Sequence, residues 1–370
     1  MHALRQRVAR LLPTACGVVA AAGVAFVVDL DHQETPTNLA DEPAYYRKDG
    51  AAAFKKAVLV DSDVVLVSYP KCGTSWAHAI VFSLLRMDED GNVEPKGGAA
   101  IGDGNGAVGG AVGGVGAAGE CGSSGQVYPD GIRATANDVD VVKSFGGWSF
   151  DDMLAQRQPR LFTSHSRAEA LPASLGDKGR LIVFARDPKD ALVSGYFFVE
   201  TLDAKPISRL RAWHTNGMQG YFDAFTTDRA GATDAADAPD ATYGDWWTWH
   251  RCAADRAAEL RGRAHVCFFE AFVGDFDAEA HRLASFLKVP LTPTKLAALR
   301  RRVQIGGQSG ATVQTERLGV VGDHRAHLTA AHWLKVDALF SKRVGEAPSL
   351  SPLAPGNVFS KALAAASRAP

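Results

Sequence analysis

The sequence predicts an α/β protein of three layers, with helices on both faces of a central parallel β-sheet. From residue 60 onward, short apolar runs alternate with longer segments of helical spacing, and this alternation is typical of parallel sheets with crossover helices. The 370 residues can form one large domain or two, with a sizeable core in either case. Ligands of such folds bind beyond the carboxyl ends of the strands, so the residues after each strand are the first candidates for chemistry.

The strands are predicted from short runs of apolar residues. Asp63–Ser68 is a continuous apolar run, which is expected of a strand buried on both faces of a sheet. A turn is predicted over 69–74 and a helix over 75–86. Another helix is expected to begin at Pro188, because proline is favoured in the first turn of a helix. The remaining elements are strands at 161–164, 181–185 and 265–269 and helices at 188–200, 245–260 and 276–287.

The composition excludes several classes of protein. The formal net charge is −1 at pH 7, without the excess of basic residues that nucleic-acid binding requires. The five cysteines are odd in number and widely separated, and no two of them form a CxxC pair. We therefore expect no nucleic-acid partner, no disulfide scaffold and no structural zinc site.

Two segments of biased composition are predicted to be loops. Residues 97–125 contain 13 glycines and only two charged residues, so ordering them would cost much backbone entropy and bury little surface. We expect a flexible insertion there, and a second, acidic loop at 227–242. The predicted organisation is an N-terminal extension at 1–40, a main domain at 41–346 that carries both loops, and a C-terminal tail at 347–370.

The N-terminal segment has two interpretations. Arginines at positions 5, 7 and 10 precede the uncharged stretch Leu11–Val28. This stretch is close to the minimum length that crosses a bilayer, and an acid-free, arginine-rich start also resembles a transit peptide or signal sequence. An ordinary N-terminal strand or helix is the alternative. Contact with a membrane is expected only if residues 11–28 act as an anchor.

The first candidate site is the segment YPKCGTSW at 69–76, between a predicted strand and a helix. A glycine at the bend and the N-terminus of a helix present backbone N–H groups and partial positive charge to an anion. Lys71 adds a full charge, and Thr74 and Ser75 add hydroxyl donors. We interpret the segment as an anion-binding loop, with an ordinary turn as the alternative. It lacks the GxxxxGK[ST] pattern, which argues against a kinase or an ATPase.

Three further motifs lie at the ends of predicted elements. Arg186 ends a strand, where its guanidinium can bind an anion through two hydrogen bonds, and Ser194 lies about two turns along the next helix. His165 follows another strand, in a position for a general base. Residues 316–325 form a glycine-containing basic loop. The ordinary alternatives are a surface ion pair with a helix-interior serine, a structural histidine and a solvated turn.

Together these segments resemble motifs of the cytosolic-type sulfotransferase family, which transfers a sulfuryl group from 3′-phosphoadenosine 5′-phosphosulfate (PAPS) to a hydroxyl or an amine. YPKCGTSW resembles the family's 5′-phosphosulfate loop YPKSGTTW, and ARDPKDALVSGYFF resembles its 3′-phosphate strand and helix. RLGVVGDHRAHLT resembles the C-terminal loop RKGxxGDWKxxFT, and TSH lies where the family has KTH. The resemblance extends from Phe54 to Phe340 and implies a P-loop-like fold.

The resemblance implies a role for each matching residue. The predicted catalytic residues are His165, Lys71 and Ser194. His165 would remove the acceptor proton, and Lys71 would stabilise charge on the leaving phosphate. Trp76 would pack against the adenine ring, unless it is a core tryptophan. No metal is expected, because lysine, arginine and backbone amides supply the charge stabilisation. The 5′-phosphate would be held by Cys72, Gly73, Thr74 and Ser75, and the 3′-phosphate by Arg186, Ser194, Arg317 and Gly319.

The chain departs from the family's motifs at several positions. Phe269 stands where the family commonly has tyrosine, which predicts the loss of one nucleotide contact, and Leu318 removes a positive charge near the 3′-phosphate. The family's dimer motif is not recognisable in residues 328–334, so we expect a monomer or a weak dimer. The other departures are Cys72 for serine, Thr163 for lysine and His324 for tryptophan.

The expected function is sulfuryl transfer from PAPS to a hydroxyl or amine of a small molecule, with 3′-phosphoadenosine 5′-phosphate (PAP) as the product. A non-catalytic nucleotide-binding or scaffold protein is the alternative, favoured by Leu318, Phe269 and Thr163. The family implies a cytoplasmic enzyme. If the N-terminal segment is an anchor, a membrane-anchored luminal enzyme for carbohydrate or protein acceptors is a further alternative, and a transit peptide would imply an organelle.

The acceptor itself is not identified by the sequence. Loops at 145–154, 197–221 and 304–316 are expected to surround it at the mouth of the sheet. Six aromatic residues are candidates for an apolar acceptor pocket or, alternatively, for the core: Trp148, Phe150, Phe198, Trp213, Tyr221 and Phe222.

Overall fold

The computed structural model describes residues 53–93, 153–201, 216–227, 245–303, 319–345, 347–355 and 357. The sheet within these residues has four parallel strands in the order β2-β1-β3-β4. The strands are β1 (Val64–Ser68), β2 (Leu161–Ser164), β3 (Arg180–Ala185) and β4 (Ala264–Phe268). The predicted parallel sheet is therefore confirmed.

The register brings the carboxyl ends of the strands to one edge of the sheet. Ser68, the last residue of β1, pairs with Phe184 near the end of β3. Ser164, the last residue of β2, pairs with Val67. Because the chain passes from β1 to β2 on one side and then to β3 on the other, the strand order reverses at β1. Such a reversal is where open α/β sheets bind their ligands.

The helices begin and end at well-marked residues. Pro188 is the first residue of its helix, as predicted. The α-helices are α4 (Thr74–Arg86), α6 (Pro188–Thr201), α8 (Gly217–Thr226), α9 (Trp246–Glu259), α10 (Phe269–Gly274), α11 (Phe276–Leu287), α12 (Pro293–Arg302) and α13 (Ala330–Arg343). Short 3₁₀-helices are η2 (Ala168–Ala170), η3 (Ala173–Gly176), η6 (Asp323–Ala326) and η7 (Pro348–Leu353).

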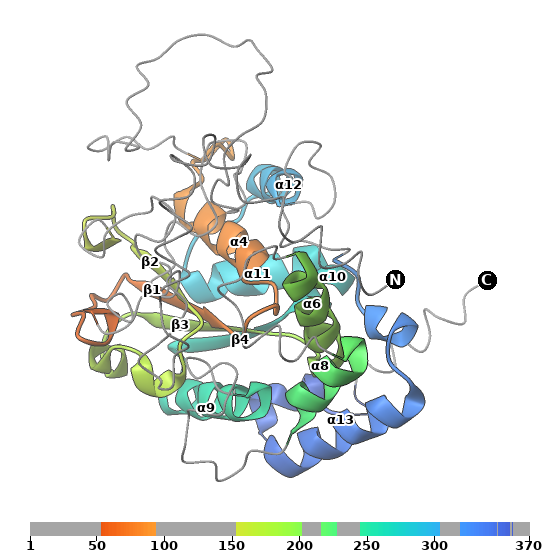
Figure 1. Ribbon diagram of the computed structural model, residues 1–370. Helices are drawn as coiled ribbons and strands as arrows, with labels where there is room; N and C mark the ends of the chain where they lie inside the picture. Colours follow the sequence, from red (N-terminus) through yellow and green to blue (C-terminus); the bar gives the residue numbers. More distant parts are fainter. Residues whose placement is uncertain are drawn as a thin grey trace, which may run out of the picture. The chain divides into compact units, whose positions relative to one another are not determined.

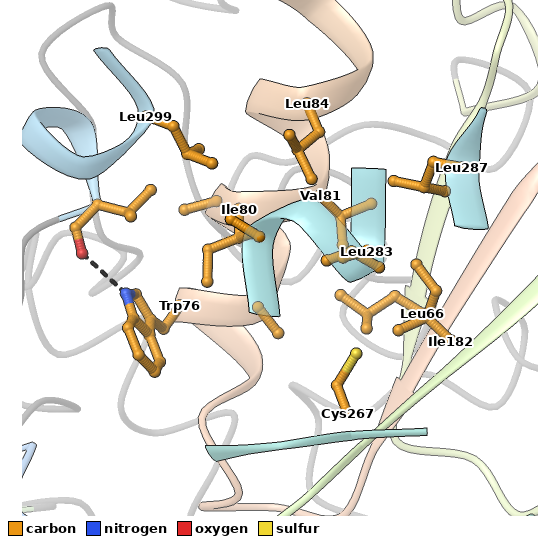
Figure 2. Packing of buried hydrophobic residues seen from close by; sticks show 14 of the residues in the cluster. Leu66, Trp76, Ile80, Val81, Leu84, Ile182, Cys267, Leu283, Leu287 and Leu299 are labelled. Atoms are coloured by element: carbon orange, nitrogen blue, oxygen red, sulfur yellow. Dashed lines mark hydrogen bonds between the residues drawn. The ribbon is translucent and has the colours of Figure 1, made fainter. Parts of the chain in front are cut away.

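Helices cover both faces of the sheet, which confirms the three-layer architecture (Figure 1). Successive residues of a strand point to opposite faces, and β1 follows this rule. Val64 and Leu66 join the hydrophobic cluster under α4 and α11, whereas Val65 and Val67 join the cluster over α9. Figure 2 shows the first of these clusters, in which leucine side chains of α4 and α11 pack over the sheet. All of β1 is thus buried, as its apolar run predicts.

The structure differs from the sequence-based prediction between the main elements. The loop expected over 197–221 is wrong at both ends, because α6 continues to Thr201 and α8 begins at Gly217. α10 and α12 are also additional to the predicted helices. α10 has 6 residues and α12 has 10, and both are too short for a helical period to stand out in the sequence.

Several predictions concern parts of the chain outside the described residues. These are the N-terminal extension, the glycine-rich insertion at 97–125 and the acidic tract at 228–242. They remain predictions. Among the residues that the structure describes, no helix is both long and apolar enough to cross a membrane.

A buried ion pair joins β1 to β2 at the amino end of the sheet. Arg160 donates to both carboxylate oxygens of Asp63, at 2.9 Å from Nε and 2.6 Å from Nη2, and Asp63 is fully buried. Asp63→Ala would leave the guanidinium without its counter-ion, and breaking a buried pair in this way costs about 3–5 kcal/mol. We expect urea denaturation to show a loss of this size in the free energy of unfolding.

The control is the exposed ion pair between Asp61 and Lys178. Surface pairs contribute about 0–1 kcal/mol, so Asp61→Ala should unfold at nearly the wild-type urea concentration. Equal losses in the two variants would contradict a special contribution from the buried pair.

Candidate active site

Four short segments meet where the strands end. They are residues 69–73 after β1, His165 after β2, Arg186 and Asp187 after β3, and Phe269 and Glu270 after β4. Contacts between these segments, described below, confirm that the residues from three separate motifs lie together. They form one site at the carboxyl edge of the sheet.

The loop between β1 and α4 has the backbone of an anion-binding turn. Lys71 and Gly73 both have positive φ, 67° and 94°. A Cβ atom at Gly73 would lie 2.9 Å from the Phe269 ring, so this close approach requires glycine. Gly73 is the N-cap of α4 and provides no side chain to accept the first N–H groups of the helix. Thr74 is fixed beside them, since its hydroxyl lies 2.6 Å from that of Ser68. The first turn can therefore receive an anion.

Cys72 has a mainly structural position in this loop. Its N–H donates to the Tyr69 carbonyl at 3.1 Å and closes the turn. A phosphate contact from this amide would have to share that hydrogen bond. Burial raises the pKa of the Cys72 thiol to about 12, so the side chain stays a neutral thiol. Replacement of the family's serine by cysteine thus adds no charge to the site.

Lys71 reaches across the site to α6. Its Nζ lies 4.1 Å from the centre of the Phe198 ring, a cation–π contact. Ser194 is four residues before Phe198 on the same helix, so both lie on one face of α6. The ammonium group is therefore on the side of α6 that carries the half-buried Ser194.

His165 is held in the tautomer that a general base needs. Its Nδ1 lies 2.8 Å from the carbonyl oxygen of Ser68. A carbonyl oxygen can only accept a hydrogen bond, so Nδ1 carries the proton and the lone pair is on Nε2. The same bond ties His165, which follows β2, to the end of β1, where the lysine loop (residues 69–73) begins.

Thr163, two residues earlier, faces α4 instead of the site. Its hydroxyl lies 2.9 Å from Nδ1 of His78, and both residues are fully buried. Burial lowers the pKa of His78 to about 4, so this imidazole is neutral at pH 7. The pair therefore provides no positive charge in place of the lysine that the family has at Thr163.

Arg186 is a buried cation that forms no ion pair with any described carboxylate. It is 8% exposed, and its guanidinium packs 4.3 Å from the centre of the Phe269 ring. Nη1 donates to the carbonyl of Lys71 at 3.2 Å and Nη2 approaches that of Val320 at 3.4 Å. Nε is buried and has no hydrogen-bond partner among the described residues. Buried charges are normally paired, so this arrangement favours an anionic ligand.

The C-terminal loop is fastened to α6 through Asp190. This buried carboxylate accepts hydrogen bonds from the N–H of Gly322 at 2.7 Å, from the N–H of His324 at 3.0 Å and from His324 Nδ1 at 2.7 Å. Gly319, at the start of the described part of the loop, has a φ of 60°. The loop thus returns to Arg186 through Val320. Arg317 and Leu318 lie outside the described residues.

Trp76, in the first turn of α4, points into the core between this helix and the sheet. It is 9% exposed, makes edge-on contacts with Phe184, Phe269 and Phe272, and donates its indole N–H to the carbonyl of Val303 at 2.8 Å (Figure 2). This packing supports the alternative that it is a core tryptophan. Tyr221 and Phe222, candidates for an acceptor pocket, are likewise buried in the core.

Glu270 is a buried residue of the site that the sequence analysis did not identify. Its Oε1 accepts the N–H of Asp187 at 2.9 Å, so it holds the backbone directly after Arg186. Burial, together with the nearby Asp187, raises the pKa of Glu270 to about 8. Its position next to Phe269, directly after β4, was the available signal. Within the described ranges, no three His, Cys, Asp or Glu residues are grouped as metal ligands.

Glu270 is expected to make stability depend on pH. Because the pKa of Glu270 is higher in the folded state than the ordinary glutamate pKa of 4.5, the folded chain binds more protons between pH 4.5 and 8. Its contribution to the free energy of unfolding therefore falls as the pH rises through this window. Glu270→Gln keeps an oxygen for Asp187 but cannot ionise. The free energy of unfolding of Glu270→Gln, relative to that of the wild type, should therefore increase from pH 5 to pH 8, as measured by urea denaturation. A difference that is constant with pH would contradict the assignment.

Comparisons with known proteins identify the family of the chain. A family model described as sulfotransferase domain matches residues 61–348. The 3-alpha-hydroxysteroid sulfotransferase of Cavia porcellus is 24% identical over 312 residues, which are 79% of this chain and 87% of the relative. Human sulfotransferase 2A1 is 22% identical with the same coverage of both chains.

Solved structures show the same fold. Mouse sulfotransferase SULT7A1 complexed with PAP superposes with a TM-score of 0.54 at 16% identity and covers 82% of this chain and 91% of its own. Retinol dehydratase in a complex with retinol and PAP gives a TM-score of 0.51 at 14% identity, with coverage of 80% and 85%. The family model covers most of the chain. The chain therefore belongs to the sulfotransferase family, as a remote member of its cytosolic, PAPS-dependent type.

Proposed function

We propose that this sulfotransferase transfers the sulfuryl group of PAPS to a hydroxyl group of a small molecule, with His165 as the general base. The observation that carries the proposal is the hydrogen bond from His165 Nδ1 to the Ser68 carbonyl. With Nδ1 as the donor, Nε2 is the ring nitrogen that can accept a proton. The same bond holds the imidazole beside Ser68, which directly precedes the lysine loop. The names of similar proteins, which include hydroxysteroid sulfotransferases and a retinol complex, support a small hydroxylated acceptor.

The residues of the site fit the nucleotide. Arg186 is buried, and its Nε has no hydrogen-bond partner in the part of the chain that the structure describes, so it suits the doubly charged 3′-phosphate. The first turn of α4 after Gly73 suits the 5′-phosphosulfate. Lys71, Thr74 and Ser75 would complete the 5′ side, and Ser194, Arg317 and Gly319 the 3′ side. When bound, PAPS supplies a sulfuryl group attached to a phosphate that leaves readily.

Different side chains would remove the acceptor proton and stabilise the charge on the leaving phosphate. His165 Nε2 would take the proton of the acceptor hydroxyl, and the Ser68 carbonyl would stabilise the imidazolium through Nδ1–H. The Lys71 ammonium would stabilise negative charge on the phosphate side, where a preorganised cation acts without solvent rearrangement. Phe198 keeps that ammonium group directed across the site.

Calorimetric binding of PAP to the full chain tests the nucleotide assignment, with EDTA present and AMP as the control that lacks the 3′-phosphate. We expect micromolar or tighter binding of PAP and much weaker binding of AMP. A transfer assay with PAPS and hydroxysteroid or phenol acceptors then tests catalysis. Binding of PAP without transfer to any acceptor would favour the non-catalytic nucleotide-binding alternative. A folded protein that binds no PAP would overturn the donor assignment.

A further inference from the structure

We infer that Trp249 of α9 is a positioning residue for His165, an inference that rests on the proposed role of His165 as the base. The indole Nε1 of Trp249 donates a hydrogen bond to the backbone carbonyl of His165 at 2.8 Å. Trp249 itself is 1% exposed, so this donor is removed from bulk water. The sequence resemblance assigns no role to it.

Hydrogen bonds from two directions hold His165, one to its ring and one to its backbone. The imidazole ring of His165 is fixed by the Ser68 carbonyl, and its peptide group is fixed by the Trp249 indole. The Trp249 ring also makes an edge-on contact with the Tyr69 ring, at 6.1 Å between centres. Tyr69 follows Ser68 directly in the lysine loop. One side chain therefore contacts both segments whose spacing decides whether base and sulfuryl donor meet.

The His165 carbonyl needs such a partner because the strand ends before it. The ladder between β1 and β2 extends to the pair of Val67 and Ser164, and the Trp249 indole supplies a donor to the first carbonyl beyond it. A part-buried carbonyl that loses this donor keeps part of the cost of desolvation. Its peptide group is then free to rotate toward another donor, and the imidazole would move with it. Displacements near 1 Å at a reacting group lower rates by roughly 10²-fold.

The first turn of α9 is a rigid support for this indole. The carboxylate of Asp245, the N-cap, accepts hydrogen bonds from the Thr248 N–H and hydroxyl, both at 2.9 Å. Arg343 of α13 donates to both residues as well, at 3.1 Å to Asp245 Oδ2 and 2.7 Å to Thr248 Oγ1. Trp249 follows Thr248, so its backbone is held from two helices. The position of the indole donor is thus fixed by the N-cap of α9 and by the hydrogen bonds from Arg343 of α13.

The helix also contains a matched control. Trp247, two residues earlier, is 0% exposed, and its indole nitrogen has no hydrogen-bond partner among the described residues. Trp247→Phe and Trp249→Phe remove the same atoms from equally buried sites. Only the second removes a hydrogen bond to the backbone of the base.

The test compares turnover and nucleotide affinity in the full-length variants. Trp249→Phe should lower kcat by about 10- to 100-fold, while Kd for PAP stays within about twofold of the wild type because the ring packing is kept. Trp247→Phe should leave kcat within about twofold. Trp249→His, whose ring can also donate an N–H, should retain more of kcat than Trp249→Phe. This variant still tests the inference if the phenylalanine variant does not fold.

Two outcomes would overturn the inference: equal kcat for Trp249→Phe and Trp247→Phe, or a parallel loss of kcat and PAP affinity in Trp249→Phe. The second would mean a general structural role. His165→Gln, measured in the same assay, separates these failures from failure of the proposed function. If His165→Gln transfers as well as the wild type, the base assignment itself fails. If it is inactive while Trp249→Phe resembles Trp247→Phe, only the role of Trp249 is lost.

Discussion

Replacing His165 by glutamine is expected to lower kcat by about 10²- to 10⁴-fold, the usual contribution of a general base. Glutamine offers an amide N–H for the Ser68 carbonyl that Nδ1 now contacts at 2.8 Å, but it has no basic nitrogen to take the acceptor proton. The proposed phosphate-binding groups follow β1 and β3 or belong to α6 and the C-terminal loop, and none of them follows β2, so Kd for PAP should stay within about threefold of the wild type. A coupled transfer assay and calorimetry measure the two quantities.

His281 on α11 is an exposed histidine that provides the control. His281→Gln should leave both kcat and Kd unchanged. If His165→Gln loses PAP binding while the fold is preserved, His165 belongs to the nucleotide site instead. If it retains turnover, another group removes the proton.

The main features of the fold could be predicted because they depend on local patterns. The apolar run of β1, Val64–Val67, predicted burial on both faces, and this strand precedes the lysine loop in the sheet. The candidate site residues Lys71, His165 and Arg186 each lie within three residues of the end of a strand. In a parallel sheet, this alone brings them to one edge.

The supporting residues could not be predicted, because their roles depend on contacts between distant segments. Asp190 binds the loop around His324, 134 residues later. In the sequence, His324 is simply a departure from the family's tryptophan, whereas in the structure its ring adds a hydrogen bond to that carboxylate. Trp249 reaches the carbonyl of a residue 84 positions earlier. Neither contact produces a periodic pattern in the sequence from which it could be predicted.

Burial changes the chemistry of some residues that the sequence shows as ordinary. Glu270 was not singled out in the sequence, but the structure encloses it, and burial raises its pKa to about 8. Trp76 reads as a motif residue and packs as a core residue with its N–H on Val303. Motif matching identifies the position of such residues, and only the packing around them decides what they contact.

Lys71→Met should lower kcat by about 10²- to 10³-fold, the cost of removing one charge-stabilising donor at a reacting centre. The substitution keeps an unbranched side chain beside the Phe198 ring, which now lies 4.1 Å from the ammonium nitrogen. Residue 71 has a φ of 67°, and methionine is no more strained there than lysine. The loss of the cation–π contact costs about 0.5–1 kcal/mol, so this contact accounts for a change of no more than about 1 kcal/mol in the free energy of unfolding.

Lys178→Met removes a half-exposed lysine that pairs with Asp61 at the surface, and it provides the matched control. It should leave turnover unchanged. The decisive comparison is between kcat and the free energy of unfolding of Lys71→Met. If Lys71 only packs against α6, its replacement should lower both quantities in proportion. A Lys71→Met enzyme that turns over like the wild type would remove Lys71 from the mechanism. One that unfolds much more readily would make its role structural. A large loss of kcat with nearly unchanged urea denaturation would support Lys71 as the group that stabilises the departing phosphate.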